Sequence, residues 1–192
     1  DHYLQERLRD DPAWSDNPSA VVAQVRELLQ DAQTQFEGER EELRQKFFEP
    51  IFQRLGFRAS RRRSVETEQT EPDYLLHGAD GKTLSVAFVY PWERWLDGAD
   101  AGDAETPDEN PGACVVTALD AGVADWVIVT NGRFWRLYSR NVHARSTNFY
   151  EVDLVKAILD SGEAESNLAF RYWWLFFRAE AFQKEGTVGQ KT

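Results

Sequence analysis

The chain has 192 residues, of which 42% are hydrophobic and 13% aromatic, so we expect one packed globular domain rather than a disordered segment. No apolar run approaches the roughly 18–20 residues that span a bilayer, and no signal peptide opens the sequence; we therefore expect no membrane contact and a cytoplasmic location. The single cysteine, Cys114, excludes a disulfide framework and a cysteine metal cluster. Because the chain begins at Asp1 and holds no methionine, we expect it to be cut from a longer protein.

The net charge of −11 argues mildly against a simple DNA-binding module, which usually carries a basic excess. The charge is unevenly distributed, however. A basic cluster consists of Arg54, Arg58, Arg61, Arg62 and Arg63. An acidic cluster consists of Asp97, Asp100, Asp103, Glu105, Asp108 and Glu109. The sign of the net charge therefore does not decide whether the chain binds DNA.

The first part of the chain has the apolar spacing of helices. Residues 1–18 form a lead segment that ends in a proline-containing loop. From Ser19 to Phe36 the apolar residues recur every three or four positions, and a second such stripe runs over residues 43–55, beyond an interruption at Gly38. Within it, Pro50 predicts a turn or a kink. Gly56 is a candidate cap at the end of the helix.

The remaining sequence alternates between strand and helix patterns. We expect strands at 71–76, 82–90, 126–132, 134–139 and 148–154, with tight turns at 78–81 and at the Asn-Gly pair before residue 133. We expect helices at 113–121, 154–161 and 167–182, and a mobile, solvated loop over 98–112. Such an order predicts an α/β domain with a mixed central sheet flanked by helices.

Seven segments, taken in order, resemble the N-terminal nuclease region of single-chain (type IIG-like) restriction-modification enzymes, in which nuclease and methyltransferase are fused. They are HYLQERL (2–8), FFEPIFQRLGF (47–57), EPDYLL (71–76), YPWERWLD (90–97), DWVIVTNGRFWRLYSR (125–140), FYEVDL (149–154) and FRYWWLFFRAEAF (170–182). The resemblance implies the restriction-endonuclease-like fold, called PD-(D/E)xK after its active site. We therefore expect residues 19–192 to form one nuclease-like domain, with a helical arm (19–55), a sheet core (56–155) and C-terminal helices (156–182).

The active site of that family needs two acids and a lysine on neighbouring strands. The acids hold Mg²⁺ against the scissile phosphate, and the lysine orients water and neutralises developing charge. Asp73 matches the first acid, within Glu71-Pro72-Asp73. Aligning residues 91–97 with the family places Phe88 at the second acid and Tyr90 at the lysine. Cys114 stands where the family carries a glutamine.

We considered whether the missing groups come from elsewhere. Lys82 faces the same side as Phe88 but lies about 20 Å upstream at roughly 3.3 Å per residue, which excludes it. Glu93 and Asp97 reach Asp73 only if the chain turns sharply after Pro91. Glu49, on the preceding helix, is the remaining candidate for a second carboxylate. With Phe88 and Tyr90 filling the vacated pocket, the Tyr90 hydroxyl needs an acceptor, for which we expect Asp73.

Other residues have both a functional and a structural interpretation. The cluster Arg58, Arg61, Arg62 and Arg63 is a candidate phosphate contact or a solvated loop. Arg133 and Arg136 are candidate DNA contacts, for which surface hairpin charges are the favoured interpretation. The aromatic stripe Phe170, Trp173, Trp174 and Phe177 indicates core packing or a docking face more than a base-stacking platform.

Three functions remain open. The first is a catalytically inactive nuclease-like domain that positions DNA or serves as a structural module in a restriction-modification or anti-phage protein, beside downstream methyltransferase or helicase-type domains, and with no cofactor. The second is an active endonuclease that binds Mg²⁺ through Asp73 together with Glu49 or Glu93. The third is a protein-interaction domain, favoured by the acidic charge and by an exposed aromatic helix.

Overall fold

The computed structural model describes residues 19–35, 40–62, 71–142, 145–160 and 163–183. The expected lead segment 1–18, the interruption at Gly38 and Arg63 of the basic cluster lie outside these residues. In the described part of the chain no helix has the length and apolarity required to cross a membrane.

The N-terminal helices form one face of the molecule. Helix α2 spans Ser19–Gln35, as its apolar spacing predicts, and buries Val25, Leu29 and Ala32. A second helical stretch begins with α3 (Arg40–Leu43), continues as the π-helical turn η2 (Arg44–Phe48) and ends with α4 (Glu49–Arg54).

The chain stays helical from residue 40 to residue 54, so a turn at Pro50, one of the two predicted alternatives, is wrong. Proline lacks an amide hydrogen, and in a regular helix its ring would collide with the carbonyl four residues earlier. The π-helical turn widens the backbone just before Pro50: the amide of Glu49 donates to the carbonyl of Arg44, five residues back. Gly56 closes the helix with a φ of 84°, which confirms the predicted glycine cap.

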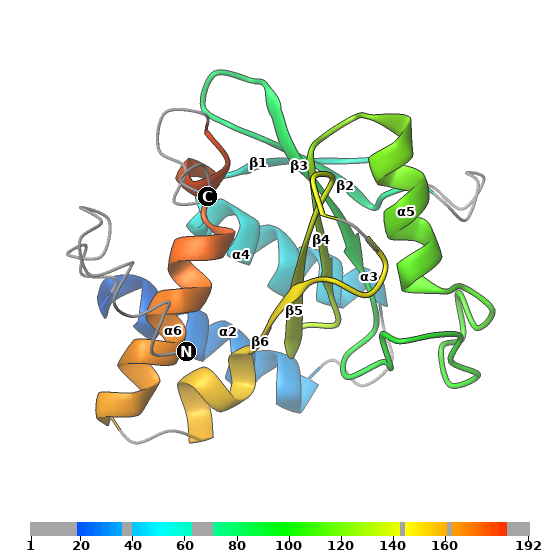
Figure 1. Ribbon diagram of the computed structural model, residues 1–192. Helices are drawn as coiled ribbons and strands as arrows, with labels where there is room; N and C mark the ends of the chain where they lie inside the picture. The colour runs from blue at the N-terminus through cyan, green and yellow to red at the C-terminus, as the bar shows by residue number, and fades with distance from the viewer. Residues whose placement is uncertain (1–18, 36–39, 63–70, 143–144, 161–162, 184–192) are drawn as a thin grey trace.

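A six-stranded mixed sheet forms the centre, in the order β1-β2-β3-β4-β5-β6 (Figure 1). Its strands are β1 (Arg58–Arg61), β2 (Tyr74–His77), β3 (Thr83–Val89), β4 (Trp126–Thr130), β5 (Phe134–Ser139) and β6 (Tyr150–Asp153). Strands β3 and β4 pair in parallel, and all the other neighbours are antiparallel. This arrangement confirms the predicted α/β class with a mixed sheet flanked by helices.

Strand β1 was not expected, because we interpreted the arginine-rich segment that it occupies as a candidate phosphate contact or a solvated loop. Its four residues are exposed, as a loop would be, yet they pair in register with β2, Ala59 opposite Leu76. The sequence RASR has no alternation of apolar and polar residues, so the usual sign of a half-buried strand is missing. This edge strand is formed by backbone pairing to its neighbour.

Helix α5 (Pro111–Ala121) provides the crossover that two parallel strands require. It begins two residues before the expected position. The side chain of Asn110 caps it by accepting a hydrogen bond from the amide of Gly112 at 2.9 Å, and Gly122 ends it with a φ of 72°.

The sheet separates two hydrophobic cores, and Figure 1 shows the helices that cover its two faces. On one face lie α2, α4 and the C-terminal elements η3 (Lys156–Asp160), α6 (Glu163–Phe177) and η4 (Ala179–Phe182). On the other face lies α5, packed over Phe88, Tyr90, Val127 and Val129. The stripe on α6 belongs to the first core: Phe170, Trp173 and Phe177 are at most 1% exposed. Core packing is therefore confirmed for these three residues, and the exposed aromatic helix assumed for a protein-interaction domain is wrong.

Candidate functional site

Asp73 stands at the entrance to β2, where its side chain reaches the end of the neighbouring strand β3. Its backbone carbonyl accepts a hydrogen bond from the amide of Arg62, which continues the β1–β2 pairing. Its carboxylate is buried and accepts the amide hydrogen of Val89 at 2.9 Å through Oδ2. Asp73 thus lies beside the end of β3, the strand on which the resemblance led us to expect the second acid and the lysine.

Two arginines neutralise this buried carboxylate. Nη2 of Arg44 donates to Oδ1 of Asp73 at 2.7 Å, and Nη2 of Arg40 lies 3.6 Å from the same oxygen. Arg40 also donates to the carbonyl of Val89 at 2.7 Å. We call Asp73, Arg40 and Arg44 the Asp73 cluster. Two guanidinium groups thus balance the charge of the buried Asp73 carboxylate.

Phe88 and Tyr90, which we aligned with the second acid and the lysine, are both buried. Phe88 and Tyr90 point toward α5 and belong to the core on that face. The Tyr90 hydroxyl donates to Oε1 of Glu109 at 2.7 Å, so our expectation that Asp73 accepts it is wrong. The physical reason is that Asp73 is already satisfied by Arg44 and by the amide of Val89, whereas the loop before α5 brings Glu109 to the hydroxyl. Burial, reinforced by this carboxylate, raises the pKa of Tyr90 well above its usual value.

Cys114, which we aligned with a glutamine of the family that the sequence resembles, lies in the same core. It is 3% exposed, on the first half of α5, and its thiol is near enough to contribute to the raised pKa of Tyr90. Phe88, Tyr90 and Cys114 therefore occupy one packed region beneath α5.

The acidic segment was predicted to be a mobile, solvated linker, but part of it is buried around Arg94. The guanidinium of Arg94 donates to Oδ2 of Asp103 at 2.8 Å and to the carbonyl of Glu109 at 2.7 Å, and lies 4.6 Å from the centre of the Tyr90 ring. Asp103, Thr106 and Glu109 are all at least 94% buried. We call Arg94 and these three residues the Arg94 cluster. A buried arginine thus orders a loop whose composition is typical of a linker.

The carboxylate of Asp103 is held in its charged form. Burial opposes ionisation, but hydrogen bonds from the hydroxyl and the amide of Thr106 and from the amide of Glu105 outweigh it and lower the pKa of Asp103. The hydroxyl of Thr106 also accepts a hydrogen bond from Arg40 at 3.3 Å, which joins the Arg94 cluster to the Asp73 cluster.

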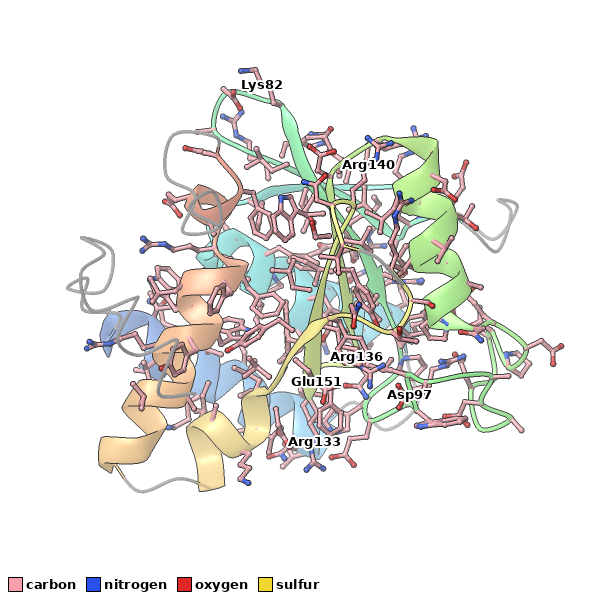
Figure 2. The ribbon with its side chains drawn as sticks, in the orientation of Figure 1. Lys82, Asp97, Arg133, Arg136, Arg140 and Glu151 are labelled. Atoms are coloured by element: carbon pink, nitrogen blue, oxygen red, sulfur yellow. The ribbon has the colours of Figure 1, made fainter. Side chains whose placement is uncertain are left out.

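The chain does turn sharply after Pro91, yet it carries neither candidate acid to Asp73. Glu93 has a φ of 58°, unusual for a residue with a side chain, and its carboxylate pairs with Arg133 at 3.1 Å. Asp97 pairs with Arg136 at 2.8 Å, and Figure 2 shows these two residues close to Glu151.

Glu49 and Lys82 are also engaged elsewhere. Oε1 of Glu49 accepts hydrogen bonds from Nε of Arg61 at 2.6 Å and from the hydroxyl of Tyr74 at 3.3 Å. Lys82 is 81% exposed and pairs with Asp80 at 3.1 Å. Figure 2 places it at the opposite end of the sheet from Asp97 and Arg136, as its distance along the strand predicted.

The candidate DNA-contacting arginines differ in what they bind. Arg61 pairs with both Glu41 and Glu49 at 2.6 Å, and Arg133 pairs with Asp153 at 2.9 Å. Arg58 donates to the carbonyl of Ala79, and Arg62 is exposed.

Arg136 is buried, so our favoured interpretation of this residue as a surface charge is wrong. It is only 7% exposed and binds Glu151 at 2.6 Å as well as Asp97. Its place is a buried position on β5, where two carboxylates from other segments neutralise it.

These groups do not fit a nuclease metal centre. Among the described residues no three histidine, cysteine or acidic side chains come together as metal ligands. Both oxygens of Asp73 have protein donors, and Tyr90 directs its hydroxyl to Glu109. We therefore derive no hydrolytic step through Mg²⁺ at Asp73.

The polar groups that sequence analysis missed are Arg40, Arg44 and Arg94. A signal was present for the first two: Arg40 lies three positions before Leu43 and Arg44 lies three positions before Phe47, so each is close to the apolar face of its helix. Arg94 offered no such signal. Its partners Asp103 and Glu109 come from an irregular loop whose path no spacing rule gives.

Comparison of this chain with protein-family models, with curated proteins and with solved structures finds no match in any of the three.

Proposed function

We propose that this chain is a catalytically inactive, restriction-endonuclease-like domain that belongs to a restriction-modification or anti-phage protein. The order of its elements supports this proposal: a helix, three antiparallel strands, a crossover helix and a strand parallel to the third. Asp73 lies beside the end of β3, where such a fold assembles its active site. The segments that resemble the nuclease region are distributed along the chain between residues 2 and 182.

The Asp73 cluster is the observation that carries the proposal. A nuclease needs its buried acid to bind a divalent cation, whereas Asp73 is bonded to Arg44 at 2.7 Å and faces Arg40 at 3.6 Å. A metal ion entering this position would meet two guanidinium groups and no second carboxylate provided by β3. Like-charge repulsion therefore opposes metal binding.

A metal-binding and cleavage experiment tests the inactivity. Supercoiled plasmid is incubated with the protein and millimolar Mg²⁺ or Mn²⁺ at physiological ionic strength. In a second experiment, Mn²⁺ binding to the protein is measured by calorimetry. We expect no cleavage above a protein-free control and no saturable Mn²⁺ binding. Cleavage that disappears in Asp73→Ala, but persists in the matched surface variant Asp80→Ala, would overturn the proposal.

An active endonuclease with a rearranged site is less well supported. It requires a second carboxylate beside Asp73, and the two candidates, Glu49 and Glu93, are bonded to Arg61 and Arg133. The methyltransferase or helicase-type domains expected downstream would supply any catalytic activity of the whole protein, with this domain as a structural or DNA-positioning module.

A further inference from the structure

The Asp73 cluster carries more positive charge than its buried acid can neutralise. Arg40 and Arg44 each bring one positive charge, and Asp73 brings one negative charge. The remaining charge faces Glu105, whose side chain is 49% exposed and approaches the two guanidinium groups at 3.3 and 3.9 Å. Glu105 is thus a half-exposed carboxylate that faces both guanidinium groups of the cluster.

Donor atoms of the two arginines remain without a hydrogen bond inside the described part of the chain. The closest carboxylate oxygens to Nη1 of Arg44 belong to Glu41 at 3.7 Å and Glu105 at 3.9 Å, both longer than a hydrogen bond. Glu41 is already bound by Arg61 at 2.6 Å. Nε of Arg40 is buried and has no acceptor among the described residues. Of these two donors, Nη1 belongs to the partly exposed Arg44, so it is the one that can reach a ligand or water.

We propose that the Asp73 cluster is a phosphate-binding site for the backbone of duplex DNA, and that Glu105 occupies the position of that phosphate in the unbound protein. The proposal rests on the inactive nuclease-like function argued above, since it places DNA where a nuclease of this fold would hold it. Its ligand is a phosphodiester, which carries one negative charge and replaces the Glu105 carboxylate charge for charge.

The accessible partner in this site is Arg44. Its side chain is 15% exposed, whereas that of Arg40 is 1% exposed, so Arg44 contacts the phosphate and Arg40 supports the site with its charge. A guanidinium that already donates to Asp73 through Nη2 is held in one orientation and presents Nη1 to an incoming oxygen. Displacing Glu105 moves one half-exposed side chain and leaves the buried Asp103 and Thr106 of its loop in place. Glu105 is therefore an autoinhibitory contact.

Fluorescence anisotropy with a labelled DNA duplex tests the site in the full chain. The key variant is Glu105→Gln, and its matched control is Glu42→Gln, which removes the same charge from a 41% exposed side chain that pairs with Lys46. We expect Glu105→Gln to tighten duplex binding about three- to fivefold over the control, with a steeper salt dependence. The double variant Glu105→Gln/Arg44→Gln should lose this gain.

Each possible result of the anisotropy experiment either supports the phosphate site or overturns it. Equal affinity of Glu105→Gln and Glu42→Gln would show a net-charge effect only and would overturn the site, and so would a gain that survives Arg44→Gln. If Arg44→Gln impairs folding, the comparison of Glu105→Gln with Glu42→Gln decides alone. A mononucleotide that responds to Glu105→Gln while the duplex does not would assign the site to free phosphates and overturn the DNA assignment. Metal-dependent cleavage would instead overturn the inactive nuclease-like function, whatever the anisotropy shows.

Discussion

The molecule pairs arginine with carboxylates in two very different environments, and the difference shows which charges hold the fold together. In the Arg94 cluster the side chains of Arg94 and Asp103 are at most 1% exposed. In the pair between Arg133 and Glu93 the side chains are 35% and 49% exposed. Both pairs form hydrogen bonds of ordinary length, at 2.8 and 3.1 Å. If one partner is removed, water can hydrate the remaining charge only in the exposed pair. An exposed ion pair therefore contributes little to the free energy of unfolding, whereas breaking a buried one costs much more.

Removing the buried arginine of the Arg94 cluster is the strongest test of this comparison. In Arg94→Met the apolar volume is kept, while Asp103 loses its ion pair and the carbonyls of Thr106 and Glu109 lose their donor. We expect the free energy of unfolding to fall by about 3–5 kcal/mol. Urea denaturation followed by circular dichroism measures it, with Arg140→Met as the control at an exposed pair. A loss no larger than that of the control would show that other contacts hold the loop.

The Asp73 cluster should respond less strongly, because Arg44 is partly exposed and Arg40 keeps other acceptors. Asp73→Asn leaves Arg40 bonded to the carbonyl of Val89 and beside Glu105. We expect a fall of about 2–3 kcal/mol in the free energy of unfolding, again by urea denaturation. The matched variant Asp80→Asn, at an exposed pair with Lys82, should show no measurable change. A stabilised Asp73→Asn would mean that Asp73 is a strained acid that lacks its natural cation.

The sequence was sufficient for the fold class because most elements are specified locally. The apolar spacing of α2 and the Asn131-Gly132 turn between β4 and β5 each depend on residues close together in the chain. Strand β1 could not be found in this way. Its exposed residues have no apolar pattern, and its pairing with β2 depends on a neighbour beyond the intervening loop.

The site was less predictable, because its contacts join distant segments. The hydrogen bond from Arg40 to Val89 connects residues 49 positions apart, and no spacing rule anticipates it. The arginine run is visible in the sequence, and the resemblance drew attention to Asp73, which lies beside the end of β3. The arginines that neutralise Asp73 could not be predicted in the same way. Runs of like charge are easily seen in a sequence because they are local, whereas the charges of this candidate site lie singly among apolar or acidic residues.

Ionisation of the Tyr90 hydroxyl should lower the free energy of unfolding by less than the loss of a buried arginine does, but by more than the loss of an exposed ion pair. Because burial raises its pKa in the folded state, stability is constant below the unfolded-state value of about 10 and falls as the pH rises above it. Each such tyrosine contributes a slope of about 1.4 kcal/mol per pH unit. Urea denaturation from pH 8 to 11.5 should therefore show a shallower alkaline decline for Tyr90→Phe than for the parent protein. Tyr138, whose pKa burial also raises, provides Tyr138→Phe as a comparison at a second buried ring. Parallel declines in Tyr90→Phe and the parent protein would mean that the Tyr90 hydroxyl ionises with equal ease in the folded and unfolded chains.

We expect the smallest change in the free energy of unfolding when Arg133, which forms an exposed ion pair with Glu93, is replaced. Arg133→Gln removes contacts to both Asp153 and Glu93, which is more ion pairs than Arg94 makes, so a count of salt bridges would predict the larger loss here. Solvent screening predicts the opposite: a loss below about 1 kcal/mol at low salt that shrinks further near 1 M sodium chloride. Urea denaturation at both salt concentrations distinguishes the two expectations. A loss approaching that of Arg94→Met, and unaffected by salt, would mean that the number of pairs rather than their burial determines the stability of this fold.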